Sequence, residues 1–303
     1  MHSREIEKLF LRNEAGDSAE FSVRSHFHVN ISKDAEGLSD VENEIYSAAG
    51  IDQAGGTFTG YHIEARDIEL TGHINSLDKD RVRDLRHSLI HVLNPAQQLT
   101  LIYQHGEYMR KIKCRAESAP KFSADGIFQR FTLGLLCLDP FWTDTGETVD
   151  EAATWQGAME FDSAGGLELT NSDSDPRWEL GMRESSLIAN IINKGDARTG
   201  MEITFTAGAA VKNPGIRNAD TGEFIQINTT MAAGEILTVN TGYGVKSVKL
   251  TKESGTEDAW RLLNVDSTFL QLEPGSNPLR YYAETGEANL DVVIRHSNLY
   301  LGV

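Results

Sequence analysis

The sequence predicts a mainly β protein with two domains. Short runs of alternating apolar and polar residues recur along the chain, and turn-forming residues separate them. Only one segment, residues 78–94, repeats its apolar residues at helical spacing. The 303 residues are enough for about two domains with separate cores. A boundary near the midpoint divides the chain into residues 1–143 and 144–303.

The first half holds strand signals on both sides of the helical segment. Phe27, Val29 and Ile31 alternate with polar neighbours, as expected for a half-buried strand. Residues 32–52 are acidic and irregular, so we expect a loop there with a short helical turn at 41–46. The expected strands of this half are residues 4–12, 21–23, 26–31, 58–74, 99–103, 108–114 and 128–138.

The helical segment is amphipathic. Its apolar stripe consists of Val82, Leu85, Leu89 and Val92. Ser76 or Asp78 can cap its N-terminus, and Pro95 ends it by disfavouring helical geometry at Asn94. We expect this helix to cover one face of a sheet.

The midpoint of the chain combines a strand, a stop and two large rings. The apolar run 133–138, interrupted only by Gly134, fits a strand buried on both faces. Pro140 ends it, because proline has no amide hydrogen for a sheet and pushes Asp139 out of the helical region. Phe141 and Trp142 then need a packing site, and a polar acidic segment follows. These four residues predict the domain junction.

The second half predicts an antiparallel β-sandwich, because many short strands alternate with turn residues. The expected strands are residues 201–206, 224–227, 236–239, 245–250, 269–272, 279–282 and 290–294. The turns between them contain Pro-Gly, Thr-Gly, Ala-Gly and Ser-Gly pairs.

The charge disfavours a nucleic-acid binder. The chain has 28 basic and 45 acidic residues, a formal charge of −17. Both halves are acidic and neither contains a basic run, whereas phosphate binding requires a cationic surface. Cys114 and Cys137 are expected to be small buried hydrophobic residues rather than a disulfide scaffold. The sequence shows no signal peptide or membrane span, so we expect a chain that is cytosolic when made.

Two histidine pairs have a spacing that suits a metal ion. His87 and His91 stand four residues apart on the helix, and His26 and His28 lie on one side of a strand. Neither pair has an evident third ligand, so the sequence favours exposed polar residues and predicts no metal. The acidic segment 34–44 lacks the ligand pattern of a calcium loop.

No catalytic motif is visible. The chain contains neither a phosphate-binding loop nor a nucleophile elbow, and we expect no cofactor and no enzyme activity. Aromatic residues of the second half that suit sugar stacking are Trp155, Trp178, Trp260, Tyr281 and Tyr282. Core packing is the favoured use for most of them.

Several motifs occur in an order typical of one family. After residues 139–142 these motifs are residues 191–196, 199–200, 213–218, 221–223, 234–235, 246–248, 272–277 and 300–303. Each alone is a weak turn-and-strand signature, but their order and spacing are specific. The chain resembles the distal tail proteins (Dit) of long-tailed bacteriophages, the siphophage tail-component family. The resemblance covers nearly the whole length.

The resemblance implies an N-terminal β-sandwich or split-barrel domain with one helix, and a C-terminal galectin-like antiparallel β-sandwich. It implies a structural protein that forms a homo-hexameric ring at the distal end of the tail, after assembly in the host cytoplasm. The ring would join the tail tube protein to the tail-tip or baseplate proteins, and DNA would pass through its lumen without specific binding. An acidic wall is compatible with that passage. Residues 32–56 match no family motif.

Two other functions are weighed against the tail hub. The first is a carbohydrate-binding, lectin-like module that recognises host cell-wall glycans, which requires an exposed aromatic residue with polar neighbours. The second is a glycan-cleaving enzyme, which requires two carboxylates flanking a cleft. The tail hub is the favoured function.

Overall fold

The computed structural model describes residues 6–52, 54–125, 128–152, 155–157, 181–183 and 188–303. The chain forms two compact units. The first unit comprises residues 1–146 together with the final six residues, Asn298–Val303. The second unit comprises Glu147–Ser297. Each has its own hydrophobic core, and the mainly β fold predicted from the sequence is confirmed.

The first unit contains most of the α-helical structure. Its helices are α1 (Ile31–Asp34) and α2 (Lys79–Val92). Its strands are β1 (Lys8–Asn13), β2 (Ser18–Ser22), β3 (Phe27–His28), β4 (Ala35–Glu36), β5 (Asn43–Ala48), β6 (Thr57–Ile63), β7 (Arg66–Ile74), β8 (Leu99–His105), β9 (Tyr108–Ala116), β10 (Lys121–Asp125), β11 (Phe128–Cys137), β12 (Trp142–Asp144) and β27 (Leu299–Tyr300).

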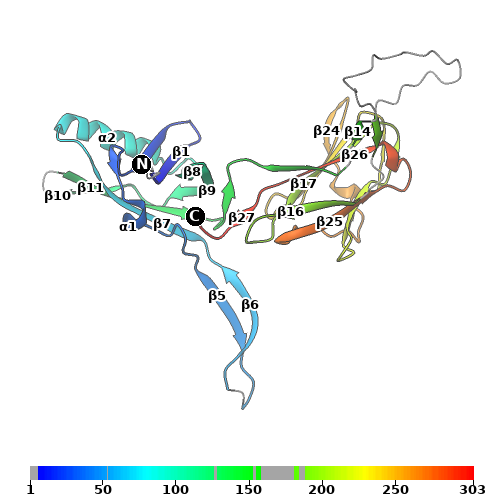
Figure 1. Cartoon of the computed structure of the whole chain (residues 1–303), viewed down its shortest axis with the longest axis horizontal. Coiled ribbons are helices and arrows are strands. Elements are labelled where there is room, and N and C mark those ends of the chain that lie inside the picture. The colour runs from blue at the N-terminus through cyan, green and yellow to red at the C-terminus, as the bar shows by residue number, and fades with distance from the viewer. Residues whose placement is uncertain (1–5, 53, 126–127, 153–154, 158–180, 184–187) are drawn as a thin grey trace, which may run out of the picture. The chain divides into compact units, whose positions relative to one another are not determined.

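Seven of these strands close into a barrel (Figure 1). The order is β11-β7-β3-β2-β1-β8-β9, and pairing of Leu135 with Ala116 joins β9 back to β11. Only β2 and β3 run parallel; the other pairs are antiparallel. Closure removes the open sheet edges of these strands, which would otherwise expose unpaired backbone groups.

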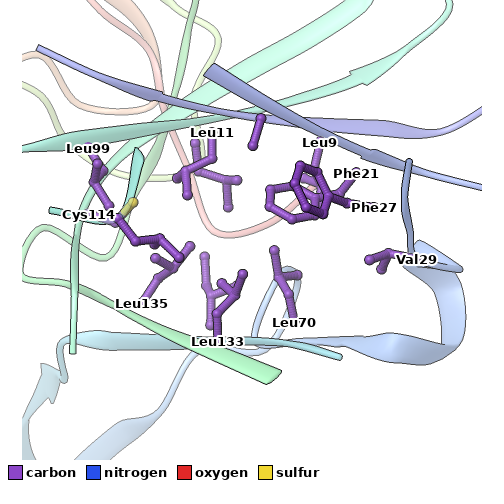
Figure 2. Close-up of a cluster of buried hydrophobic side chains, with 14 of the residues drawn as sticks. Leu9, Leu11, Phe21, Phe27, Val29, Leu70, Leu99, Cys114, Leu133 and Leu135 are labelled. Atoms are coloured by element: carbon purple, nitrogen blue, oxygen red, sulfur yellow. The ribbon is translucent and has the colours of Figure 1, made fainter. Parts of the chain in front are cut away.

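The interior of the barrel is filled by alternate side chains of its strands (Figure 2). Phe21, Phe27 and Phe131 form an aromatic group with ring centroids 5.7 to 6.0 Å apart. Gly72 lies beside it, and a Cβ there would stand 2.4 Å from the carbonyl oxygen of His28 and 2.9 Å from the Phe131 ring. The close approach of β3 and the Phe131 ring to β7 therefore requires glycine at position 72.

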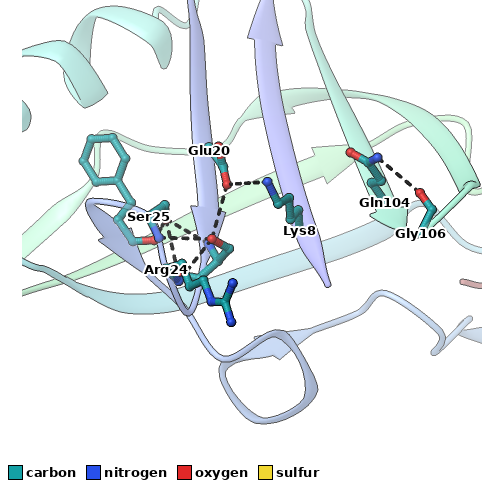
Figure 3. Close-up of polar contacts among 8 residues, drawn as sticks. Lys8, Glu20, Arg24, Ser25, Gln104 and Gly106 are labelled. Carbon is teal, nitrogen blue, oxygen red and sulfur yellow. Dashed lines mark hydrogen bonds and ion pairs between the residues drawn. The ribbon is translucent and has the colours of Figure 1, made fainter. Parts of the chain in front are cut away.

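A hydroxyl network turns the chain from β2 into the parallel strand β3 (Figure 3). The buried Ser22 hydroxyl accepts hydrogen bonds from the backbone amides of Arg24 and Ser25, at 3.3 and 3.1 Å, and donates to Glu20. Glu20 also pairs with Lys8 on β1, with 3.2 Å between Nζ and Oε1. The Ser25 hydroxyl donates to the Phe27 carbonyl at 2.7 Å. These bonds pair backbone amide and carbonyl groups of the turn that have no partner in a neighbouring strand.

The predicted helix corresponds to α2, which packs against β1 and β2. Leu89 and Val92 are buried, while Val82 and Leu85 are partly buried against the same core. The Asp78 side chain accepts a hydrogen bond from the amide of Asp80 at 3.0 Å. Of the two candidate caps, Asp78 occupies the N-cap position.

Asp78→Ala is expected to destabilise the first unit by about 1 kcal/mol, the usual cost of removing an N-cap oxygen. Urea unfolding of the variant and the native protein measures the difference. Asp84→Ala is the matched control, because Asp84 lies within α2 and is exposed. Equal losses in the two variants would contradict a capping role.

Three sequence expectations in the first unit are wrong. The expected strand 26–31 is reduced to β3, which ends at His28, and Ile31 begins helix α1. Residues 43–48 form strand β5 instead of a helical turn, and they pair with β6 in a hairpin. Nearly all residues of this hairpin are exposed, so its strands show no alternation of buried and exposed positions. Strand β11 is not buried on both faces: Leu133, Leu135 and Cys137 point into the barrel, but the alternate residues on its outer face are partly exposed. The strand ends at Cys137, and Leu138 is 72% exposed.

The second unit is an antiparallel β-sandwich, as the sequence predicts. Its larger sheet has the order β13-β26-β17-β22-β23-β24, and its smaller sheet has the order β16-β25-β19-β20. Its strands are β13 (Thr148–Glu151), β14 (Trp155–Gly157), β15 (Gly181–Arg183), β16 (Ile188–Asn193), β17 (Met201–Ala207), β18 (Val211–Lys212), β19 (Gly215–Asn218), β20 (Phe224–Gln226), β21 (Thr230–Met231), β22 (Ile236–Asn240), β23 (Ser247–Lys252), β24 (Gly255–Asp258), β25 (Gly275–Tyr282) and β26 (Leu290–His296). Two short 3₁₀ helices are η1 (Trp260–Leu262) and η2 (Glu287–Asn289).

The two sheets share one apolar core. Ile203, Phe205 and Val239 from the larger sheet belong to the same buried cluster as Ile216 and Tyr281 from the smaller sheet. One expected strand is absent: residues 269–272 form no ladder, and only Leu272 makes an isolated bridge, with Thr199. This segment is held by the isolated bridge between Leu272 and Thr199 and does not pair with a neighbouring strand. Its apolar alternation alone therefore predicted a strand that does not form.

Candidate functional site

The residues predicted to form the domain junction lie within the first unit. Asp139 is exposed, and its carboxylate accepts a hydrogen bond from the amide of Phe141 at 3.3 Å. Pro140 and Phe141 are half-buried. Trp142 begins β12, is fully buried in the core of this unit, and donates from Nε1 to the carbonyl oxygen of Leu38 at 3.0 Å. The role of these residues as a joint between the units stays a prediction.

Arg66 is the polar centre of this region. Its side chain is buried, and its Nε donates to the carbonyl of Pro140 at 2.8 Å. One terminal nitrogen donates to the carbonyls of Gly37, Leu38 and Asp40, and the other donates to the carbonyl of Leu301. Burial lowers the pKa of the guanidinium from its usual range, but arginine remains charged at neutral pH. The five-donor fork of arginine suits such a convergence of carbonyls.

Arg66 thereby helps to anchor the C-terminal tail, Asn298–Val303, to the first unit. Strand β27 pairs with β12, so that Trp142 lies opposite Tyr300. Arg110 donates to the carbonyl of Gly302 at 2.6 Å, and its guanidinium carbon lies 3.3 Å from the centroid of the Tyr300 ring. The hydroxyl of Ser39 donates to the carbonyl of Val303 at 2.8 Å.

Asp144 fixes the start of the same tail. Its Oδ2 accepts hydrogen bonds from the Asn298 side chain at 2.9 Å and from the Tyr300 hydroxyl at 3.2 Å. Burial, assisted by this carboxylate, raises the pKa of Tyr300. The second unit is therefore an insertion between β12 and β27, and both of its chain connections start from paired strands of the first unit.

The hairpin β5–β6 carries a group of exposed apolar side chains in the first unit. Figure 1 shows it extending away from the barrel. Ile45 pairs with Tyr61, and Ser47 pairs with Phe58 across a bulge, so all four side chains share one face. The exposed fractions of Ile45, Phe58 and Tyr61 are 65, 62 and 62%. The two aromatic rings stack with centroids 6.5 Å apart.

The opposite face of the hairpin is polar. Tyr46 donates its hydroxyl to Glu44 at 3.0 Å, and this hydrogen bond raises the pKa of Tyr46. One apolar and one polar face make the hairpin amphipathic. A two-stranded ribbon of this kind is marginally stable alone in water and is stabilised when its apolar face is covered.

The histidines considered as metal ligands are exposed or contact other side chains. His87 and His91 are exposed on α2, and His91 lies 3.4 Å from a carboxylate oxygen of Asp17. His26 contacts Arg81 at 2.8 Å, while the His28 ring stacks on His73 with centroids 4.4 Å apart. In the described parts of the chain, no group of three or more His, Cys, Asp or Glu side chains is arranged to hold a metal ion.

The other candidate residues divide between core and surface. Cys114 and Cys137 are free and buried in the barrel, as expected for small hydrophobic residues. Tyr281 is buried in the sandwich, whereas Trp260 is 46% exposed. Trp178 and the side chain of Trp155 lie outside the described residues. Neither α-helix of the described chain has the length and apolar character needed to cross a membrane.

Sequence reasoning missed Arg66 and the hairpin. Arg66 occurs in a charged stretch, and its five partners belong to three segments far apart in the sequence, so no local pattern reveals it. The hairpin had one available signal: Ile45, Tyr46, Phe58 and Tyr61 place large apolar residues on both sides of a Gly-Gly turn.

Known proteins resemble the chain in both sequence and fold. Residues 21–137 match the family model of the phage tail protein RIFT-related domain, and residues 194–300 match that of the siphovirus-type tail component, C-terminal domain. No curated protein matches the chain.

Solved structures resemble nearly the whole chain. The crystal structure of SPP1 Dit (gp 19.1), described as a paradigm of the hub adsorption apparatus in Gram-positive-infecting phages, matches with 16% identity and a TM-score of 0.65. The match covers 96% of this chain and 98% of that one. The phage P2 baseplate in its activated conformation with Ca matches more weakly, with 14% identity, a TM-score of 0.46 and coverages of 96 and 98%.

The two family models follow one another along the chain in the order of its two units. The first model covers most of the barrel, and the second covers most of the sandwich. The two matched ranges, residues 21–137 and 194–300, together span more than half of the chain and establish the family. The chain belongs to the siphovirus tail-component family of distal tail proteins.

Proposed function

We propose that this protein is a structural hub that forms a closed hexameric ring at the distal end of a phage tail. The ring joins the tail tube protein to the tail-tip or baseplate proteins, and its lumen passes DNA without specific binding. Assembly takes place in the host cytoplasm, and the finished ring belongs to the virion. The observation that carries the proposal is the exposed apolar face of the hairpin in a chain of the tail-component family.

A neighbouring copy of the chain is the partner that we propose for the hairpin. Ile45, Phe58 and Tyr61 give one continuous apolar surface on a ribbon that its own barrel does not cover. A hairpin that reaches a different surface of the next copy makes a heterologous contact, and such contacts close into a ring when the rotation is right. Burial of the three side chains would supply several kcal/mol for each contact.

The charge of the chain supports passage of DNA through such a ring. A formal charge of −17 for each copy gives an assembly of strongly negative net charge. A negative surface does not retain a polyanion, because it offers no cations to replace the counterions of the phosphates.

Light scattering and negative-stain electron microscopy of the purified full chain test the ring. We expect a hexameric mass and closed rings with a central hole. Combined replacement of Ile45, Phe58 and Tyr61 by serine is expected to shift the protein to monomers while circular dichroism stays unchanged, because the three side chains are exposed in the monomer.

The matched control replaces Leu77 and Leu138 by serine, since these leucines are 79 and 72% exposed but lie outside the hairpin. The control variant should still form rings. A native protein that stays monomeric at high concentration contradicts the hub. Rings that persist in the triple hairpin variant contradict the hairpin contact while leaving the hub in place.

A further inference from the structure

Aromatic and basic side chains form a stripe on the second unit. The stripe consists of Arg198, Tyr243, Lys246, Phe269 and Trp260. The guanidinium carbon of Arg198 lies 5.9 Å from the Tyr243 ring, and Lys246 Nζ lies 5.6 Å from that ring and 5.0 Å from the Phe269 ring. Phe269 stacks on Trp260 with centroids 5.3 Å apart and planes inclined by 21°.

The stripe is accessible. Tyr243 and Trp260 are 65 and 46% exposed, and both cationic residues are exposed. Phe269 is half-buried and supports one face of the Trp260 indole. A large ring that is held from one side and open to water is suited to stacking a ligand on the other side.

The backbone holds these residues on a fixed base, although they come from separate loops. Thr199 and Leu272 exchange two backbone hydrogen bonds of 2.8 and 3.0 Å, which tie the Arg198 segment to the Phe269 segment. The side chain of Gln271 donates to the carbonyl of Thr241 at 2.8 Å. Gly200 approaches Gly242 so closely that a Cβ on Gly200 would lie 2.5 Å from the Cα of Gly242. Glycine at this contact brings the loops of Arg198 and Tyr243 together.

The two cations of the stripe have no carboxylate partner among the described residues. Two other cations of this unit are paired: Lys212 lies 2.6 Å from Glu284, and Lys252 lies 2.6 Å from Glu257. Within the described part of the chain, Arg198 and Lys246 form no such pair. Their position over aromatic rings leaves ammonium and guanidinium donors available to an external anion.

We propose that the stripe binds an acidic saccharide, that is, a sugar whose carboxylate or phosphate pairs with Lys246 and Arg198. The apolar face of the sugar ring stacks on Trp260 or Tyr243. A protein partner is disfavoured, because the five side chains of the stripe are far fewer than the roughly 20 residues that a protein interface requires on each side. A nucleic acid is disfavoured because its binding depends on pairing several phosphates with cations, and the stripe offers two. Stacking rings with a few placed polar groups are typical of small-ligand sites.

Isothermal titration of the full-length protein with four probes tests this site. The probes are a trigalacturonate, a phosphorylated galactotriose, a neutral galactotriose and inorganic polyphosphate. We expect binding of the trigalacturonate or of the phosphorylated galactotriose, and the probe that binds identifies carboxylate or phosphate as the acidic group. Neutral galactotriose should bind at least fivefold more weakly, because it lacks the ion pair.

Variants distinguish binding at the stripe from nonspecific attraction of an anion to basic residues. Trp260→Ala and Lys246→Gln should each weaken binding of the acidic probe about fivefold or more. Lys212→Gln removes the same charge at a residue outside the stripe and should leave binding unchanged. The proposal is overturned if neither acidic probe binds. It is also overturned if polyphosphate binds as tightly as the acidic probe and Trp260→Ala does not weaken binding of that probe. Light scattering of the same samples reports the ring separately, so failure of this site is distinguishable from failure of the hub.

Discussion

Arg66→Met is expected to lower the free energy of unfolding of the first unit by about 3–5 kcal/mol. Methionine retains much of the apolar stem but has no donor for the five carbonyl oxygens that Arg66 satisfies. A buried carbonyl without a partner costs about 1–3 kcal/mol, and relaxation around the site keeps the total below the simple sum. Urea unfolding followed by circular dichroism measures the loss.

The same variant should release the C-terminal tail, because Arg66 bonds to the carbonyl of Leu301. Carboxypeptidase digestion under native conditions should therefore remove the last residues faster from Arg66→Met than from the native protein. Arg66→Lys should lie between the two, since an ammonium group can reach only some of the carbonyls. Arg115→Met is the matched control on an exposed arginine and should change stability by less than about 0.5 kcal/mol. A protected tail in Arg66→Met would contradict the anchoring role.

The C-terminal tail explains why the sequence predicts the division into two units only in part. Residues 139–142 carry local signals, a proline and two large rings, and they lie shortly before Gly146, where the first unit ends. The return of residues 298–303 to that unit depends on Arg66, Arg110 and Ser39, which lie far away in the sequence. Long-range polar contacts of this kind leave no periodicity for a single sequence to reveal.

The hairpin and α2 show which local sequence patterns predict structure and which do not. The helix was predictable because its buried residues must recur at helical spacing to reach one core. The hairpin was not predictable in the same way, because its own unit buries neither face and so imposes no alternation. The aromatic–cation stripe likewise combines separate loops, and only Trp260 among its residues was considered from the sequence. The two surfaces that we propose to bind partners are thus the part of this fold that the sequence predicts least.

Trp142→Ala is expected to destabilise the first unit by about 3–5 kcal/mol. Trp142 is fully buried in the core of the first unit, so alanine leaves a large cavity that the surrounding residues can fill only in part. The substitution also removes the Nε1 donor from the carbonyl of Leu38. Hydrogen exchange followed by mass spectrometry, as a function of urea, measures the loss in peptides from each unit.

Trp142→Phe separates the two contributions, because phenylalanine retains most of the ring but lacks the indole donor. We expect it to cost about 1–2 kcal/mol, and Leu138→Ala, at a 72% exposed position, to cost less than about 0.5 kcal/mol. The proposed joint at residues 139–142 adds a further expectation. If Phe141 and Trp142 support the second unit, then Trp142→Ala should increase exchange in peptides of the sandwich as well as in those of the barrel. Loss confined to the barrel would contradict the joint and leave Trp142 as a core residue of the first unit alone.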